Sequence, residues 1–320
     1  EQISDLTTNI REAATYLLTQ GNIRFLLTTG LHPDHPAQQE VQLYGDGIKD
    51  IAFTVEDSAK AYEQALKNGA ESAYEPIEIT DELGTVVKSG VKSFGRFVHT
   101  FISRTGKYAI ENVKQRGEQF LPNFRVLDEL AINKYNRENP TGLFYVDRCV
   151  GNVPMGEMDV WVKWYEDVLG FKLFKHFDAE DISTEYTALM SKVMESGREL
   201  IKIPINEPAE GRNKSQIEEY LDWHNNTGGI QHLALLTKDE VNTVGELRSR
   251  GVDFLDIPET YYEMVWDRVG TIDEDIQQVK DLRVLVDRDD KGYLLQIFTK
   301  PLQDRPTMFF EMICRRVGAS

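Results

Sequence analysis

Two stretches of this sequence resemble one another and decide the fold: GIKDIAF at residues 47–53 and GIQHLAL at residues 229–235. Each begins with glycine and reads as a short apolar strand. An acidic turn, a helix-like segment (residues 58–68 or 241–250) and another glycine then follow. Similarity between two parts of one chain is typical of a repeated structural unit. The shared order of strand, helix and strand predicts an α+β fold made of two tandem units of roughly 150 to 180 residues each.

The second copy opens with a segment that the first copy lacks. Residues 144–150 read as a strand, residues 159–169 as an amphipathic helix with one apolar stripe, and residues 171–177 as another strand. Gly170 stands where a helix commonly ends. Because nothing comparable precedes Glu1, and the chain has no initiator methionine, we expect the first copy to lack its leading strand and helix.

These patterns divide the chain into three parts. Residues 1–121 are the expected N-terminal half, truncated at its start, and residues 141–320 are the expected C-terminal half. Residues 122–140, which begin and end near prolines and include a polar run, are the expected connection. A chain of 320 residues is long enough for two domains of ordinary size.

The composition excludes several classes of protein. Apolar residues make up 41% and charged residues 28%, which is typical of a folded globular chain. The 36 basic and 53 acidic residues give a net charge of −17, which repels phosphate backbones and argues against nucleic acid as a partner. Apolar runs fall far short of the roughly 18 residues that span a membrane. Two cysteines, Cys149 and Cys314, cannot form a disulfide framework, so we expect a cytoplasmic protein.

Two polar residues interrupt apolar strands of the second copy. His232 lies among isoleucine, leucine and alanine, and a buried histidine requires either a hydrogen bond or a metal. Glu311 lies in a similar run and is either an edge-strand charge or an inward ligand. Residues two apart in a strand share a face, so Phe309 points with Glu311, and Gln296 points with Phe298. Aromatic, amide and carboxyl groups together suit a pocket for a polar aromatic compound.

Among the other histidines, His99 lies in the middle of a predicted strand of the first copy. We expect it to be a hydrogen-bonded core or surface histidine rather than a ligand. His32 and His35 flank a turn, where we expect them to face solvent.

Motifs in the second copy resemble the 4-hydroxyphenylpyruvate dioxygenase family, and the resemblance covers nearly the whole chain. The matching segments are residues 150–153 (VGNV), 177–178 (FD), 183–186 (STEY), 203–208 (IPINEP), 214–217 (KSQI), 229–232 (GIQH), 292–301 (GYLLQIFTKP) and 304–311 (DRPTMFFE). The resemblance implies two halves of paired βαβββ modules, which are open barrels of the vicinal oxygen chelate (glyoxalase-like) type. It also implies that only the C-terminal half carries iron. The family closes its site with a C-terminal helix, and this chain is expected to stop before it.

The resemblance implies Fe(II) as cofactor, held by two histidines and one glutamate. His232 and Glu311 match the second and third ligands. The first ligand is the histidine of an Asp-His-x-Val-Gly-Asn-Val segment, and here Arg148 stands in its place. A guanidinium group has no lone pair to offer and stays protonated, so it cannot ligate Fe(II). We expect Arg148 to pair with Glu311 in the metal position, or, after a change of register, to face solvent.

Further residues match the substrate side of the family's site. The polar positions are Ser191, Asn206, Gln216, Gln231 and Gln296, and the aromatic walls are Phe298 and Phe309. The resemblance implies that Gln216 and Gln296 hold the phenol oxygen, that Asn206 and Ser191 orient the same network, and that Phe309 stacks on the ring. Gln231 is the weakest match, because it is adjacent to His232 and by strand period faces the other way.

The activity implied by the resemblance is conversion of 4-hydroxyphenylpyruvate, a 2-oxo acid, and O2 to homogentisate and CO2. This reaction belongs to tyrosine and phenylalanine catabolism, and family members are homodimers or homotetramers. Arg148 makes impaired iron retention the expectation for this sequence. One alternative is an oxygenase of the hydroxymandelate synthase type, which hydroxylates the benzylic carbon. The other is a metal-free binding protein that keeps the pocket but not the iron.

Overall fold

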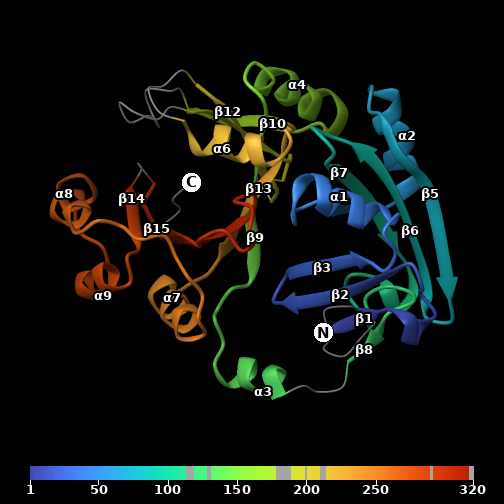
Figure 1. The fold of residues 1–320 in the computed structure, drawn as a ribbon, viewed down its shortest axis with the longest axis horizontal. Coiled ribbons are helices and arrows are strands. Elements are labelled where there is room, and N and C mark those ends of the chain that lie inside the picture. Colours follow the sequence, from blue (N-terminus) through green and yellow to red (C-terminus); the bar gives the residue numbers. More distant parts are fainter. Residues whose placement is uncertain are drawn as a thin grey trace.

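The computed structural model describes residues 1–112, 119–127, 131–177, 189–198, 200–209, 214–288 and 291–316. Within these ranges the strands form one eight-stranded sheet and two four-stranded sheets (Figure 1). The family-like segment at residues 183–186 lies outside the described residues. In the parts of the chain that the structure describes, no helix is long and apolar enough to cross a membrane.

The eight-stranded sheet belongs to the C-terminal half and has the order β10-β11-β12-β9-β13-β16-β15-β14. Its strands are β9 (Tyr145–Asn152), β10 (Lys172–Phe177), β11 (Leu189–Glu195), β12 (Lys202–Pro208), β13 (Gly229–Leu236), β14 (Leu285–Arg288), β15 (Tyr293–Phe298) and β16 (Phe309–Arg316). Two modules, β9–β12 and β13–β16, meet where β9 pairs antiparallel with β13. In each module a first strand is followed by helical structure, which comprises three helices in the second module, and then by three further strands, which confirms the predicted α+β modules.

The helices of this half include the two that the sequence predicted, at residues 159–169 and 241–250. They are α4 (Met158–Leu169), α6 (Gln216–Trp223), α7 (Glu240–Ser249), α8 (Glu259–Val269) and α9 (Ile276–Asp281). Helix α4 ends at Gly170, whose φ of 67° is the left-handed conformation that glycine adopts most easily. Its first turn is held by Glu207 of β12, whose carboxylate accepts the backbone N–H groups of Gly156 at 2.8 Å and Met158 at 3.0 Å.

The N-terminal half repeats one of these modules. Its strands β4 (Asp50–Thr54), β5 (Ser72–Asp81), β6 (Gly84–Lys92) and β7 (Val98–Arg104) have the order β4-β7-β6-β5, with α2 (Ser58–Lys67) after β4. That order matches β13-β16-β15-β14, which confirms the repeat read from the sequence. The other sheet, β3-β2-β1-β8, contains β1 (Gln2–Ser4), β2 (Ala13–Gln20), β3 (Ile23–Gly30) and β8 (Arg125–Val126), and α1 (Pro36–Tyr44) packs beside β3.

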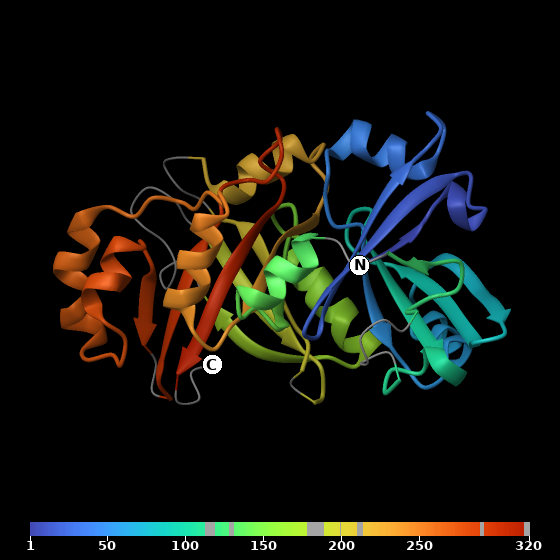
Figure 2. The ribbon, with the colours of Figure 1, turned by 90° about the horizontal axis from the view of Figure 1, so that it is seen from below.

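The predicted connection is not a featureless linker. It contains β8, which pairs with β1, and α3 (Ala131–Glu138). Figures 1 and 2 show the two halves side by side, with α8 and α9 at the end of the molecule remote from the N-terminal half.

A mixed apolar and aromatic core joins the halves. The ring of Phe94 packs against Gly151 of β9 so closely that a Cβ on that glycine would lie 2.5 Å from Phe94 Cζ. His99 of β7 is fully buried; its Nδ1 hydrogen-bonds Ile51 O at 3.2 Å, and its Nε2 accepts from Tyr165 OH of α4 at 2.8 Å. Because the Ile51 carbonyl can only accept, Nδ1 carries a proton, and burial favours the neutral ring by lowering its pKa. His99 is thus the hydrogen-bonded core histidine that the sequence predicted.

His99 makes stability depend on pH. Burial lowers its pKa from 6.5 to about 4. Below pH 6.5 the unfolded chain takes up the proton first, so the free energy of unfolding falls with pH down to about 4, by up to about 3 kcal/mol. Urea titrations of the His99→Gln variant between pH 4 and 7 are expected to show a flatter dependence. His32→Gln, at a half-exposed position, serves as control, and an equal flattening there would contradict the assignment.

Glu240, the first residue of α7, is a second titratable group in the core. Its side chain is fully buried, and neither carboxyl oxygen has a hydrogen-bond partner in the described structure. Burial, and then the negative charge of Glu311, raise its pKa well above the usual value. A carboxyl group with a raised pKa destabilises the fold as pH rises from its unfolded pKa toward its folded one.

Replacement of Glu240 by leucine therefore is expected to stabilise the protein. The free energy of unfolding should rise by about 2 kcal/mol at pH 8, because an unpartnered polar group leaves the core, and by less at pH 4. Thermal and urea unfolding at the two pH values measure the effect. Glu263→Leu, at an exposed position of α8, is the control, and a larger gain at pH 4 than at pH 8 would refute the explanation.

Candidate active site

The candidate site lies on one row of cross-strand neighbours in the C-terminal sheet. Arg148 of β9 is opposite Ala234 of β13, Ala234 is opposite Glu311 of β16, and Glu311 is opposite Phe298 of β15. One step along the same strands, His232 is opposite Phe309. The two predicted metal ligands and the two predicted aromatic walls therefore come together.

Arg148 and Glu311 form a direct ion pair. Arg148 Nη2 donates to Glu311 Oε1 at 2.7 Å, and the Glu311 side chain is only 2% exposed. Ala234, which lies between them, is buried and small, so the long arginine side chain can pass over it. Burial raises the pKa of Glu311, and the charge of Arg148 opposes that rise. Of the two expectations for Arg148, pairing with Glu311 is confirmed and a turn toward solvent is wrong.

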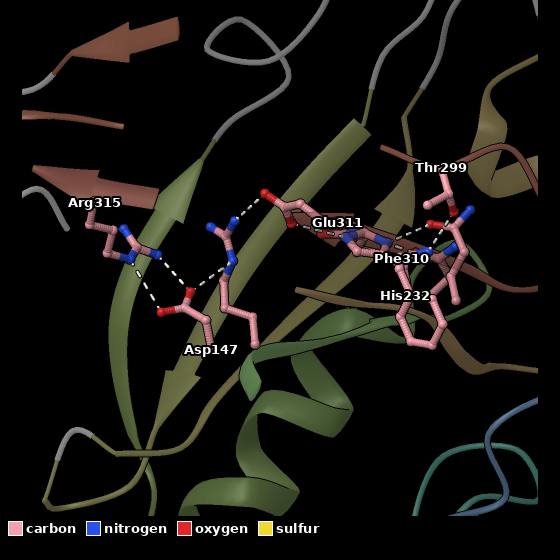
Figure 3. A network of polar contacts seen from close by, with 10 residues as sticks. Asp147, His232, Thr299, Phe310, Glu311 and Arg315 are labelled. Atoms are coloured by element: carbon pink, nitrogen blue, oxygen red, sulfur yellow. Dashed lines mark hydrogen bonds and ion pairs between the residues drawn. The ribbon is translucent and has the colours of Figure 1, made fainter. Parts of the chain in front are cut away.

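A second ion pair, between Asp147 and Arg315, lies beside Arg148. The β9–β13 register shifts between Arg148 and Val146, so Asp147 is an extra residue that bulges from β9. Arg315 of β16 binds its carboxylate through Nε at 3.2 Å and Nη2 at 2.7 Å, and Figure 3 shows the two side chains facing one another. Burial would raise the pKa of Asp147, but the hydrogen bond and charge of Arg315, with the charge of Arg148, lower it overall.

His232 is neutral and faces the ion pair. Burial, followed by the charge of Arg148, lowers its pKa to about 3. Its ring stacks on Phe309 with centroids 4.5 Å apart and meets Phe298 edge-on at 6.1 Å. His232 Nε2 lies 3.7 Å from Glu311 Oε2, on the side of Glu311 away from Asp147 (Figure 3).

Gln231 departs from the expected geometry. Strict alternation would turn its side chain away from His232, but β13 has a bulge between Ile230 and His232. Gln231 is buried, and its Oε1 lies 3.3 Å from His232 Nδ1. Because an amide oxygen only accepts, Nδ1 carries the proton, and the lone pair of the neutral ring is on Nε2, facing Glu311. The expectation that Gln231 faces away is corrected by this bulge.

The remaining predicted substrate residues lie on other elements. Ser191 of β11 is opposite Asn206 of β12, and Asn206 Nδ2 lies 3.4 Å from Asn152 Oδ1 of β9. Gln216 is the exposed first residue of α6, and Gln296 is half-buried on β15. Neither of these two amides makes a side-chain hydrogen bond in the described part of the chain, so both remain available to a ligand.

Sequence reasoning missed Asp147, Arg315 and Asn152. Arg315 had a readable signal, since it lies two and four residues beyond Ile313 and Glu311 on the same strand and so shares their face. Asp147 had none, because only the bulge brings it beside Arg148. Asn152 is fully buried, and its Nδ2 has no partner among the described residues. That unpaired donor lies beside the two polar substrate positions on β11 and β12.

The residues present do not fit Fe(II). Across the described ranges, no group of three or more histidine, cysteine, aspartate and glutamate side chains is placed to hold a metal ion. His232 and Glu311 supply two ligands, but the third position holds a guanidinium group, which has five donors and no acceptor. Its positive charge also repels a cation at close range.

Fold and site together define the class of protein. Residues 145–297 match the family model "Glyoxalase/Bleomycin resistance protein/Dioxygenase superfamily". The chain is 41% identical to 4-hydroxyphenylpyruvate dioxygenase of Dictyostelium discoideum, over 98% of this chain and 84% of that protein. It is 40% identical to the Yarrowia lipolytica protein of the same name, over 97% and 78%. The chain belongs to the 4-hydroxyphenylpyruvate dioxygenase family, as the motifs predicted.

A solved structure agrees with this placement. A triple mutant of 4-hydroxymandelate synthase from Streptomyces coelicolor superimposes with a TM-score of 0.82 and 26% identity, covering 100% of this chain and 85% of that one. The paired modules expected from the resemblance are therefore confirmed as the fold of this chain.

The ion pair at the centre makes a stability prediction. Arg148→Met would leave Glu311 buried without its partner, so the free energy of unfolding is expected to fall by about 3 kcal/mol. Arg148→Met combined with Glu311→Gln removes both charges and should recover most of that loss. Urea unfolding of both variants measures the coupling. Arg268→Met, which breaks an exposed pair with Asp287, is the control and should cost about 1 kcal/mol or less; an equal loss would contradict the prediction.

Proposed function

We propose that this chain binds 4-hydroxyphenylpyruvate in its C-terminal half, and that its iron-dependent conversion of this 2-oxo acid and O2 to homogentisate and CO2 is impaired. Identity of 41% along almost the whole chain to a 4-hydroxyphenylpyruvate dioxygenase supports the ligand and the reaction class. The observation that carries the impairment is the 2.7 Å contact between Arg148 and Glu311.

The chain's own residues would place the ligand. Phe309 and Phe298 offer two aromatic faces for the ring. Gln216 and Gln296 carry amides that make no side-chain hydrogen bond within the described ranges, and they would hold the phenol oxygen. Ser191 and Asn206, which are opposite one another on neighbouring strands, would orient that network. We assign these roles as proposals that follow from the family resemblance.

The residues present do not support the binding of iron. In the family's arrangement His232 and Glu311 would be two of three ligands for Fe(II), the proposed cofactor. As the sequence stands, Glu311 is engaged by Arg148, and a third ligand is not available at position 148. We therefore derive no reaction step through iron for this chain.

Two alternative functions are benzylic hydroxylation and metal-free binding. Identity to the 4-hydroxymandelate synthase structure is 26%, against 41% to a 4-hydroxyphenylpyruvate dioxygenase, which favours ring hydroxylation over benzylic hydroxylation. A metal-free binding protein is favoured by the buried ion pair, in which Arg148 neutralises Glu311 without a metal ion.

We also propose the finer properties that the family implies. These are a place in tyrosine and phenylalanine catabolism, a cytoplasmic location, and a homodimer or homotetramer. The proposed division of the chain is residues 1–121, 122–140 and 141–320, with the site in the last part.

Metal analysis combined with oxygen uptake tests the proposal. The chain is loaded anaerobically with Fe(II), and iron content, O2 consumption with 4-hydroxyphenylpyruvate, and homogentisate are measured. The unaltered chain is expected to hold well below stoichiometric iron and to turn over slowly. Arg148→His should raise both by about tenfold or more, because it restores a neutral nitrogen ligand.

Arg268→His, which changes an exposed arginine on α8, is the matched control and should leave both quantities unchanged. Stoichiometric iron with rapid homogentisate formation in the unaltered chain would refute the impairment. No effect of Arg148→His would show that position 148 is not the first ligand position.

A further inference from the structure

The guanidinium group of Arg148 still has donors to offer. Nη2 is bonded to Glu311, and Nε lies 3.5 Å from Asp147 Oδ2 without forming a hydrogen bond. Nη1 has no hydrogen-bond partner among the described residues. The side chain is 22% exposed, so this edge is accessible. An arginine with one edge held and one edge open is suited to a second, incoming acceptor.

The neighbours of Arg148 fix the orientation of this open edge. Arg315 donates two hydrogen bonds to the carboxylate of Asp147, and Asp147 Oδ2 lies 3.5 Å from Arg148 Nε. Glu311 accepts a hydrogen bond from Nη2, which lies on the same edge of the guanidinium group as Nε. A binding group whose neighbours fix its orientation loses little entropy when a ligand arrives.

Aromatic side chains lie next to Glu311 along the same strands. His232 and Phe309 lie two residues along their strands from Ala234 and Glu311, a displacement of about 6.6 Å in a strand. Glu311, which Arg148 contacts, and Phe309 lie two residues apart on β16 and so share a face of the strand.

We propose that Arg148 makes this centre a metal-independent receptor for the carboxylate of an aryl 2-oxo acid. The ligand's carboxylate accepts one N–H of Nη1 and the second N–H of Nη2, in the planar fork geometry that guanidinium and carboxylate share. The identity of the ligand rests on the proposed function; the role of Arg148 rests on its geometry here. The iron of the family arrangement is replaced by a fixed organic cation.

Calorimetric titration in EDTA tests the inference on the full chain. The probes are 4-hydroxyphenylpyruvate and 4-hydroxyphenylacetone, the neutral ketone in which a methyl group replaces the carboxylate. We expect the oxo acid to bind without metal, about tenfold or more tighter than the ketone, as a charge-assisted hydrogen-bonded pair implies. Equal affinities in EDTA would overturn the proposal.

Variants locate the effect at Arg148. Arg148→Met should remove the preference for the oxo acid, Arg148→Lys should keep a reduced preference because the fork is lost, and Arg268→Met should keep it in full. The double variant Arg148→Met with Glu311→Gln leaves no buried unpaired charge, so it covers the case in which the single variant does not fold. A preference that survives in either folded variant without Arg148 would overturn the proposal.

The outcomes separate this inference from the proposed function. Binding that appears only after Fe(II) is added would overturn the receptor role and leave the family reaction intact. Homogentisate formed rapidly by the unaltered chain would overturn the proposed impairment. The preference for the oxo acid in EDTA would still support the role of Arg148.

Discussion

The antiparallel pairing of β9 with β13 is the constraint on which the site depends. It joins the two modules of the C-terminal half into one sheet and sets Arg148 beside Ala234, across which the arginine reaches Glu311. Both irregularities in this pairing are bulges at the site: one adds Asp147 to β9, and the other adds Gln231 to β13. Each bulge turns an additional polar side chain toward the centre, as bulges beside active sites commonly do.

The resulting centre is an alternating line of charges. Arg315, Asp147, Arg148 and Glu311 follow one another across β16 and β9, so each charge lies beside one of opposite sign. Buried ions are costly unless they are paired and hydrogen-bonded. This pairing explains how a sheet core tolerates an arginine at position 148 while His232 stays neutral.

Much of this arrangement is legible in the sequence. The glycine-led repeat predicts the modules, and the polar residues His232 and Glu311 in apolar strands mark the centre. The chemistry of guanidinium and carboxylate predicts the ion pair. The bulges cannot be predicted from the sequence, because the alternation of side chains along a strand assumes regular pairing. Pairing partners far apart in the sequence decide where a bulge interrupts that alternation. For the same reason the positions of Asp147 and Gln231 were missed or misjudged.

The glycine at position 151 ties the two halves together mechanically. Gly151 is three residues from Arg148 on β9, and the ring of Phe94 from the N-terminal half fills the space that a side chain would occupy. The N-terminal half therefore packs against β9, the strand that carries Arg148. A part of the chain that holds none of the predicted site residues thus sets the shape of the site, and a sequence change near Phe94 would be transmitted along one short strand to the centre.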